Sequence, residues 1–240
     1  MVYGFWIVII FTLLYEPIIG YFDFQKFKVE VKRNDNVRLK YYKNIITTLW
    51  VPTVFILLLV AFTELTLTDI GLSIPSLNTE LLGPFVTYFA FAIGLLYACG
   101  ILYYSIGYHV SGKIRKKLAE VRAKQMGESS YSDILPVTRI EKKVWNAVSL
   151  TAGVTEEIIY RGFLLFAFTY LFPTMSIWII IIICSLLFGL GHTYQGFIKG
   201  VLRTTIFGVI FSILFIGMGS IIPLIILHFL IDYMAKLGES

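Results

Sequence analysis

The stretch Thr155-Glu156-Glu157-Ile158-Ile159-Tyr160-Arg161-Gly162 decides how the rest of this chain is interpreted. It places two carboxylates and one guanidinium inside a long apolar run. An ionised side chain at the centre of a bilayer costs about 2.5–3.5 kcal/mol even on the lowest experimental scale. A helix carrying three such groups can enter lipid only if they face a hydrated, protein-lined cavity and neutralise one another. The stretch therefore indicates a functional site on a membrane-spanning helix.

The composition indicates a membrane protein. Apolar residues make up 58% of the chain and charged residues 15%, against roughly 45–50% and 25% in soluble domains. The mean hydropathy is +0.81. We expect an all-α, polytopic transmembrane helical bundle with about seven spans. The apolar runs that define these spans cover residues 2–21, 44–62, 83–108, 143–172, 175–191, 198–216 and 220–237.

The basic residues predict the orientation of this bundle. Of the 20 Lys and Arg residues, seven lie between Lys26 and Lys43 and nine between Lys113 and Lys143, whereas residues 63–82 contain three acids and no base. Every basic cluster then falls on one side of a seven-span path, which places the N-terminus outside and the C-terminus in the cytoplasm. The net charge of +5 is therefore explained by the membrane and its anionic headgroups, and nucleic acid is not expected as a partner.

The polar residues divide the chain near residue 140. Residues 1–140 are expected to form an N-terminal transmembrane region of three spans and a basic cytoplasmic linker. Residues 141–240 are expected to form a core of four spans that holds the catalytic groups. Within the first span, Glu16-Pro17 is interpreted as a kink or a helix end rather than as part of a site.

Helical spacing assigns different environments to the two adjacent acids. Glu157 and Arg161 are four residues apart and share a face, so they can form an ion pair. Glu156 is rotated by roughly 100° and lies on a face with Tyr160. Glu156 is then free to act as a general base or acid. The alternative is a buried ion pair that only fixes helix packing.

Two histidine motifs follow on later spans. In Phe188-Gly189-Leu190-Gly191-His192 the glycines allow a neighbouring helix to approach closely, and His192 is either functional or an interfacial hydrogen-bonding group. His228 and Asp232 share one helical face, so Asp232 can hold the imidazole in one tautomer; the alternative is a packing hydrogen bond. Counted by depth, all these groups can converge on a water-filled cavity in the inner half of the bilayer.

These motifs resemble a known family. Glu-Glu-x-x-x-Arg, Phe-x-x-x-His and His-x-x-x-Asp, in this order on successive apolar helices over residues 145–236, are similar to the CPBP family of intramembrane proteases. That family includes the type II CAAX prenyl endopeptidases, proteins related to lysostaphin resistance protein A, and bacterial bacteriocin-processing and immunity proteins. The first three spans resemble the family only in being apolar.

The resemblance implies a role for each residue. Glu156 and His192 would activate a water molecule that attacks a peptide carbonyl, Glu157 and Arg161 would form a structural pair, and His228 with Asp232 would stabilise the oxyanion. The prenyl-protein enzymes carry asparagine in place of this aspartate, and an ionised aspartate cannot donate a hydrogen bond. Asp232 therefore orients His228, is protonated, or binds a metal.

The sequence is compatible with two alternatives, no cofactor or Zn²⁺. Glu156, His192, His228 and Asp232 make a reasonable zinc set, and a zinc-bound water would supply the nucleophile. The resemblance implies either a metalloendopeptidase or a metal-independent glutamate-type protease. Because the chain has no His-Glu-x-x-His helix, we favour chemistry without metal.

The sequence thus predicts a multi-pass protease of a bacterial plasma membrane that hydrolyses a membrane-associated peptide or protein. Nothing in the sequence selects a prenylated substrate, and processing of a secreted peptide or bacteriocin immunity fits better. One alternative is a non-catalytic bacteriocin immunity or membrane scaffold protein. Another is a proton-coupled transporter, since carboxylate and histidine chains also relay protons.

Overall fold

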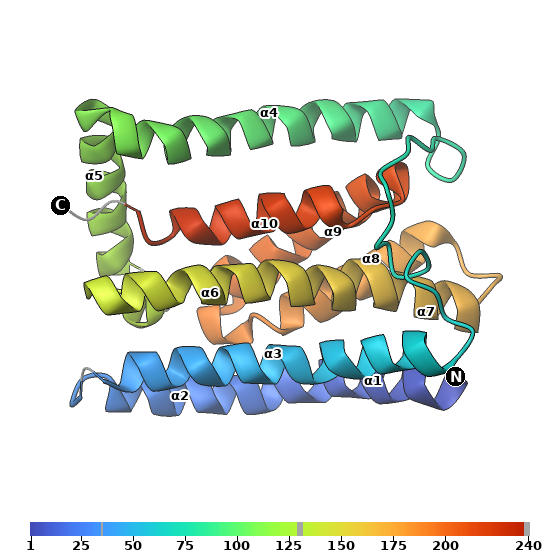
Figure 1. Ribbon diagram of the computed structural model, residues 1–240, viewed down its shortest axis with the longest axis horizontal. Coiled ribbons are helices and arrows are strands. Elements are labelled where there is room, and N and C mark those ends of the chain that lie inside the picture. The colour runs from blue at the N-terminus through green and yellow to red at the C-terminus, as the bar shows by residue number, and fades with distance from the viewer. Residues whose placement is uncertain (35, 129–131, 238–240) are drawn as a thin grey trace.

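The computed structural model describes residues 1–34, 36–128 and 132–237, and every regular element in these ranges is a helix (Figure 1). The all-helical class is therefore confirmed. The N-terminal half contains α1 (Val2–Leu14), η1 (Tyr15–Gly20), α2 (Tyr21–Glu30), α3 (Val37–Phe62), α4 (Pro84–Val110), α5 (Gly112–Glu128) and η2 (Ser132–Ile134). The C-terminal half contains α6 (Arg139–Glu156), η3 (Glu157–Leu164), α7 (Leu165–Leu171), α8 (Ile177–Leu190), η4 (Thr193–Gln195), η5 (Phe197–Leu202), α9 (Arg203–Met218) and α10 (Ile222–Met234).

Within the residues that the structure describes, four helices are long and apolar enough to cross a membrane: Val2–Glu30, Val37–Phe62, Pro84–Val110 and Phe197–Met218. Two further apolar helices, Ile177–Leu190 and Ile222–Met234, are shorter. The expected fourth span is a continuous helical segment from α6 through η3 to α7, and its first turns carry charged residues. A multi-pass membrane protein is supported, while the count of seven spans stays a prediction.

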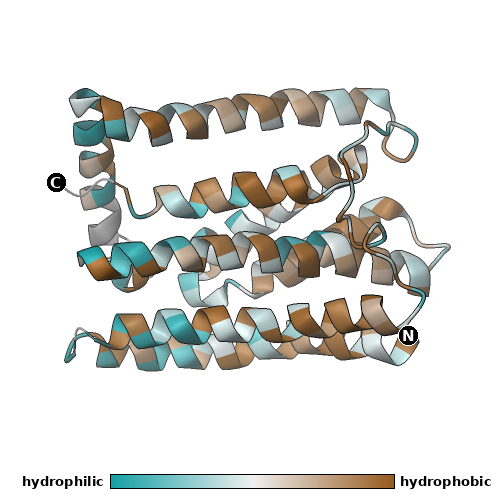
Figure 2. Ribbon diagram, viewed as in Figure 1, coloured by the Kyte–Doolittle hydropathy of each residue, from teal (hydrophilic) through white to brown (hydrophobic). Residues whose placement is uncertain are grey.

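The hydrophilic residues gather at one end of the bundle. In Figure 1 most helices run along the long axis, and α5 stands across their ends on the side where the C-terminus lies, with the N-terminus at the opposite end. Figure 2 shows α5 and the neighbouring ends of α2, α3 and α6 as the most hydrophilic part of the chain. The predicted cytoplasmic segments therefore lie at a common end of the molecule.

The start of α6 is fixed at this polar end by a capping box. The Thr138 hydroxyl accepts from the backbone of Glu141, and the Glu141 carboxylate accepts from the backbone of Thr138 at 2.8 Å. The buried Glu141 side chain also lies 3.8 Å from the Arg38 guanidinium. Two unsatisfied helix-terminal groups are thereby paired, and the helix that carries the paired acids is tied to α3.

Close packing of α6 against α10 sets the geometry further along. A Cβ on Gly153 would lie 3.1 Å from both the Ile225 carbonyl and the Phe229 amide nitrogen, so these two backbones meet where only glycine fits well. About two helical turns closer to the polar end, the Trp145 indole donates to the Asp232 carbonyl at 2.9 Å. Glu156 and Glu157, at the end of α6, consequently lie beside α10.

The connection between α3 and α4 covers the apolar end. Its backbone amides at Ser76 and Asn78 donate to the carbonyls of Met218 and Gly217, each at 2.9 Å. Gly219 turns the chain there with φ of +60°. The loop therefore fixes the α9–α10 turn and, with it, the depth of α10 in the bundle.

Candidate active site

The two adjacent acids have different surroundings. Glu157 has a fully buried side chain, whereas the Glu156 side chain is 13% exposed and lines two cavities. The difference follows from the rotation between consecutive helix positions. Glu157 therefore points into the protein and Glu156 into a space that a ligand can enter.

Glu157 is held by Arg161, as the spacing predicted. An Arg161 guanidinium nitrogen lies 3.1 Å from Glu157 Oε1, and both side chains are buried. The guanidinium lies over the Phe188 ring, 4.1 Å from its centroid, with Phe211 at 5.3 Å. Burying a charge is tolerable only with such pairing and with a polarisable aromatic face. The pair links η3 to α8 and α9.

His228 is hydrogen-bonded to Glu157, a partner that the sequence interpretation did not identify, and Asp232 lies farther from the ring. His228 Nδ1 donates to Glu157 Oε1 at 2.7 Å, whereas Asp232 Oδ2 is 3.7 Å from Nε2, beyond hydrogen-bond distance. Glu156 Oε2 lies 3.8 Å from the same Nε2. The partner of Nδ1 comes from an element other than α10. The spacing of four residues within α10 could therefore not predict this hydrogen bond. His228 Nε2 is thereby left facing two carboxylates.

His192 lies two residues beyond the end of α8 and has a defined tautomer. Its Nδ1 lies 2.9 Å from the Phe188 carbonyl oxygen. A carbonyl oxygen only accepts, so Nδ1 carries the proton and the neutral ring presents the lone pair of Nε2. The Phe188 ring packs against the His192 ring, with centroids 4.8 Å apart. This histidine can accept a proton or a hydrogen bond from a bound water.

The glycines of this motif provide room, as expected. A Cβ on Gly189 would lie 2.7 Å from the Val201 carbonyl, which is closer than real Cβ atoms approach. A Cβ on Gly191 would lie 3.2 Å from the Tyr160 hydroxyl. Gly189 therefore lets η5 and α9 approach α8, and Gly191 leaves space in front of Tyr160.

The predicted site residues converge on one cavity of about 420 Å³. Its wall includes Glu156, Arg161, His192, His228 and Asp232, together with apolar residues of α4, α5, α6, α9 and α10. A second, smaller cavity of about 90 Å³ shares Glu156 and His192 with the first. The carboxylate and the histidine thus lie where the two spaces adjoin.

Three segments beside the site are wound as π-helix: η1, η3 and η5. π-Helical turns are rare and occur frequently at functional sites. In η1, Pro17 lacks an N–H and cannot donate to the helix ladder, so the predicted kink takes the form of a π-helical turn. In η3, the change of winding begins at Glu157, directly after the acid that faces the cavity.

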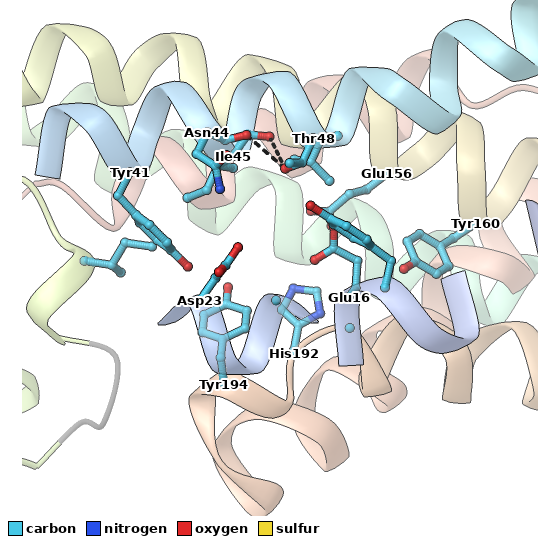
Figure 3. A pocket seen from close by; sticks show the side chains of 15 residues that line it. Glu16, Asp23, Tyr41, Asn44, Ile45, Thr48, Glu156, Tyr160, His192 and Tyr194 are labelled. Atoms are coloured by element: carbon cyan, nitrogen blue, oxygen red, sulfur yellow. Dashed lines mark hydrogen bonds between the residues drawn. The ribbon is translucent and has the colours of Figure 1, made fainter. Parts of the chain in front are cut away.

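The sequence interpretation missed the contribution of the N-terminal helices. Figure 3 shows the smaller cavity with Glu16 beside Glu156 and His192, and with Asp23 near Tyr41 and Tyr194. Glu16 was interpreted only as part of a kink. A carboxylate inside an apolar span was the signal available, but the adjacent proline offered a local explanation.

Two carboxylate oxygens of the site have no hydrogen-bond partner. Both Glu156 Oε2 and Glu157 Oε2 are inaccessible to solvent and unpaired among the described residues. Such atoms in a buried network call for a bound group or water. The Glu156 atom belongs to a side chain that borders both cavities, so a ligand there could satisfy it.

The proposed zinc set is not assembled in the described residues. Within 1–34, 36–128 and 132–237, no three His, Cys, Asp or Glu side chains are grouped so that they could hold a metal ion. Glu156 and Asp232 approach the same nitrogen of His228 rather than a common empty point.

Comparison with known proteins supports the resemblance. Residues 143–234 match the family described as type II CAAX prenyl endopeptidase Rce1-like. The match spans α6 to α10 and contains all three motifs, so the predicted family resemblance is confirmed for this segment. No curated protein and no solved structure matches the chain.

Proposed function

From the premise that residues 143–234 form an Rce1-like segment, we propose that the chain is an intramembrane endopeptidase that hydrolyses a peptide bond in a membrane-associated substrate. The observation that carries this proposal is that the two adjacent acids have different contacts. Glu157 is tied to Arg161 and His228, while Glu156 borders both cavities with an unpaired oxygen. A largely buried carboxylate that has an oxygen without a hydrogen bond and lies beside a histidine is suited to activating water.

The first step places a water molecule between Glu156 and His192. Glu156 accepts one proton from this water while the water oxygen bonds to the scissile carbonyl carbon. The Nε2 lone pair of His192 accepts a hydrogen bond and holds the water in the cavity. Positioning the nucleophile in this way converts a bimolecular attack into an effectively unimolecular one.

The second step stabilises the negative oxygen of the tetrahedral intermediate. His228 donates through Nδ1 to Glu157, so Nε2 is the nitrogen that is free to donate to this oxygen. The role requires the doubly protonated ring, and the carboxylates of Glu156, Glu157 and Asp232 within 4 Å favour that cation electrostatically. Asp232 supports this charge rather than donating a hydrogen bond.

The third step breaks the carbon–nitrogen bond. The proton held by Glu156 passes to the departing amide nitrogen, which leaves as an amine, and the other product is a carboxylic acid. Glu156 returns to its ionised form, and one water molecule has been consumed. Glu157 and Arg161 exchange no proton, since they form the buried support that fixes η3 and His228.

The test is cleavage of membrane peptides by the purified full-length chain in lipid nanodiscs. We expect Glu156→Gln to lower kcat/KM by at least about 10³-fold, because the amide cannot take the proton of water. In H₂¹⁸O the wild-type enzyme should place one ¹⁸O in the new C-terminal carboxylate, as mass spectrometry would show.

Glu80→Gln is the matched control, because Glu80 is an exposed acid outside the site. Its cleavage rate should equal that of the wild type, and both variants should elute as folded protein in size-exclusion chromatography. Undiminished cleavage by a folded Glu156→Gln variant would refute the proposed base. A cellular phenotype that persists in this variant would instead favour the non-catalytic immunity or scaffold role.

A further inference from the structure

The smaller cavity has a charge pattern that the proposed hydrolysis does not use. It lies between η1, α2, α3 and the η4 turn, and it opens beside Glu156 and His192. Glu16 and Asp23 add two carboxylates to its wall. None of the described residues that line it is lysine or arginine. We propose that this cavity is a substrate subsite for a cationic side chain, lysine or arginine, near the scissile bond; the inference rests on the proposed function.

Two polar side chains of this cavity, Glu16 and Tyr160, have no hydrogen-bond partner among the described residues. Glu16 forms no hydrogen bond or ion pair within the described ranges, and its Oε2 atom lies against Gly20, whose Cβ would be 3.1 Å away. Tyr160 is 5% exposed and borders the cavity, yet its hydroxyl has no hydrogen-bond partner in the described part of the chain. Partnered polar groups are the rule inside proteins. A cation that donates to these oxygens would complete the set.

Aromatic side chains supply part of the remaining wall. Tyr41 stacks on Phe27 with centroids 4.3 Å apart, and Tyr194 packs on Phe24 at 5.0 Å. Figure 3 shows Asp23 near both tyrosines at the end of the cavity away from Glu156. Phenol faces attract ammonium and guanidinium groups. The tyrosines are held by α2, so this region presents a fixed surface.

The size of the cavity also favours a small charged group. Its volume of about 90 Å³ is much smaller than the 420 Å³ of the neighbouring cavity. A hydrated ammonium or guanidinium head fits this space better than a bulky apolar side chain. The N-terminal helices, which resemble the family only in composition, would then select the substrate that the C-terminal helices cleave.

Binding and cleavage of matched peptides test the subsite separately from the chemistry. A lysine is moved through each position of a membrane-anchored peptide, and each peptide is compared with its norleucine counterpart on the full-length protein in nanodiscs. We expect at least one position at which lysine binds about tenfold more tightly, since close charge pairs couple strongly in desolvated sites. Where peptides are cleaved, the replacement of norleucine by lysine at the same position should give the largest increase in kcat/KM.

The variants identify the residues responsible. Glu16→Gln should bring the lysine and norleucine affinities within about twofold, and Asp23→Asn should reduce the preference. Glu30→Gln is the matched control, because Glu30 lies on α2 but pairs with Lys26 and does not line the cavity.

The possible outcomes separate the two proposals. Equal affinity for lysine and norleucine at every position, or a preference that survives in Glu16→Gln, overturns the subsite whether or not peptides are cleaved. A preference lost in Glu16→Gln without any cleavage retains the subsite and removes the protease. Cleavage without a lysine preference retains the protease alone.

Discussion

Arg161 has a structural role that its burial makes costly to remove. It pairs with Glu157 at 3.1 Å and is only 1% exposed. Arg161→Ala leaves the Glu157 carboxylate buried without its permanently charged partner, and breaking a buried pair in this way costs about 3–5 kcal/mol. We expect a lower free energy of unfolding, measured by denaturant titration in detergent micelles.

Arg139→Ala serves as the comparison for this prediction. Arg139 is an exposed arginine at the start of α6, so its removal should leave the unfolding midpoint unchanged. Arg161→Lys should recover only part of the loss, since an ammonium lacks the planar fork and stacks less well on Phe188. Equal midpoints for the two alanine variants would show that the buried pair does not stabilise the fold.

Two of the three carboxylates near His228, those of Glu157 and Asp232, should respond differently to isosteric amides. Glu157 Oε1 accepts from Nδ1 at 2.7 Å, whereas Asp232 lies 3.7 Å from Nε2. We expect Asp232→Asn to change kcat/KM by less than about tenfold, because the ring keeps its orienting partner. Glu157→Gln should lower kcat by about 10²–10³-fold, as loss of an electrostatic support does in other enzymes. Steady-state kinetics on both folded variants provides the measurement.

The reverse order of effects would restore the role that the sequence assigned to Asp232. The i, i+4 spacing correctly predicted that Glu157 and Arg161 meet, since both lie on one helix. It failed for His228, because the partner of Nδ1 comes from η3 rather than from α10. Contacts within a helix follow from spacing, whereas contacts between helices depend on packing.

Contact between α6 and α10 depends on Gly153. Its missing Cβ allows the Ile225 carbonyl and the Phe229 amide to lie close by, and both belong to rigid backbone. Gly153→Ala should force the helices apart by a few tenths of an ångström and cost about 1–3 kcal/mol, as overpacking does. The same shift moves Glu156 relative to His228, so kcat should fall together with the melting temperature.

Gly100→Ala is the control at a glycine with open surroundings. No atom lies within 4 Å of a Cβ at this position of α4, so neither melting temperature nor kcat should decrease. An unchanged Gly153→Ala variant would mean that α10 can adjust without disturbing the site.

The fold class follows directly from composition, but the number of membrane crossings does not. The 14 residues of α8 and the 13 of α10 extend only about 20 Å at 1.5 Å per residue, against a hydrocarbon core of about 30 Å. α6 begins with charged residues and is interrupted by η3. Such helices depend on neighbours that exclude lipid, a property of the packed bundle. The role of Glu16 was missed for the same reason, since only tertiary structure brings η1 to His192.

The orientation of the whole molecule yields the remaining prediction, because charge and structure agree on which segments share a side. In Figure 1, α5 lies at the end opposite the loop between α3 and α4, and positive-inside bias predicts that α5 lies on the cytoplasmic side. The test uses a Cys99→Ser, Cys184→Ala variant as the background, because these substitutions remove the native thiols. In intact cells a membrane-impermeant maleimide should label Glu80→Cys but not Lys116→Cys. Lys32→Cys, in the other basic segment, should behave like Lys116→Cys and react only after permeabilisation.

Labelling of positions 80 and 116 from the same side would require an even number of crossings between them. In that case α4 would not span the membrane, and the cavity that holds Glu156 would have to open elsewhere than towards the cytoplasm.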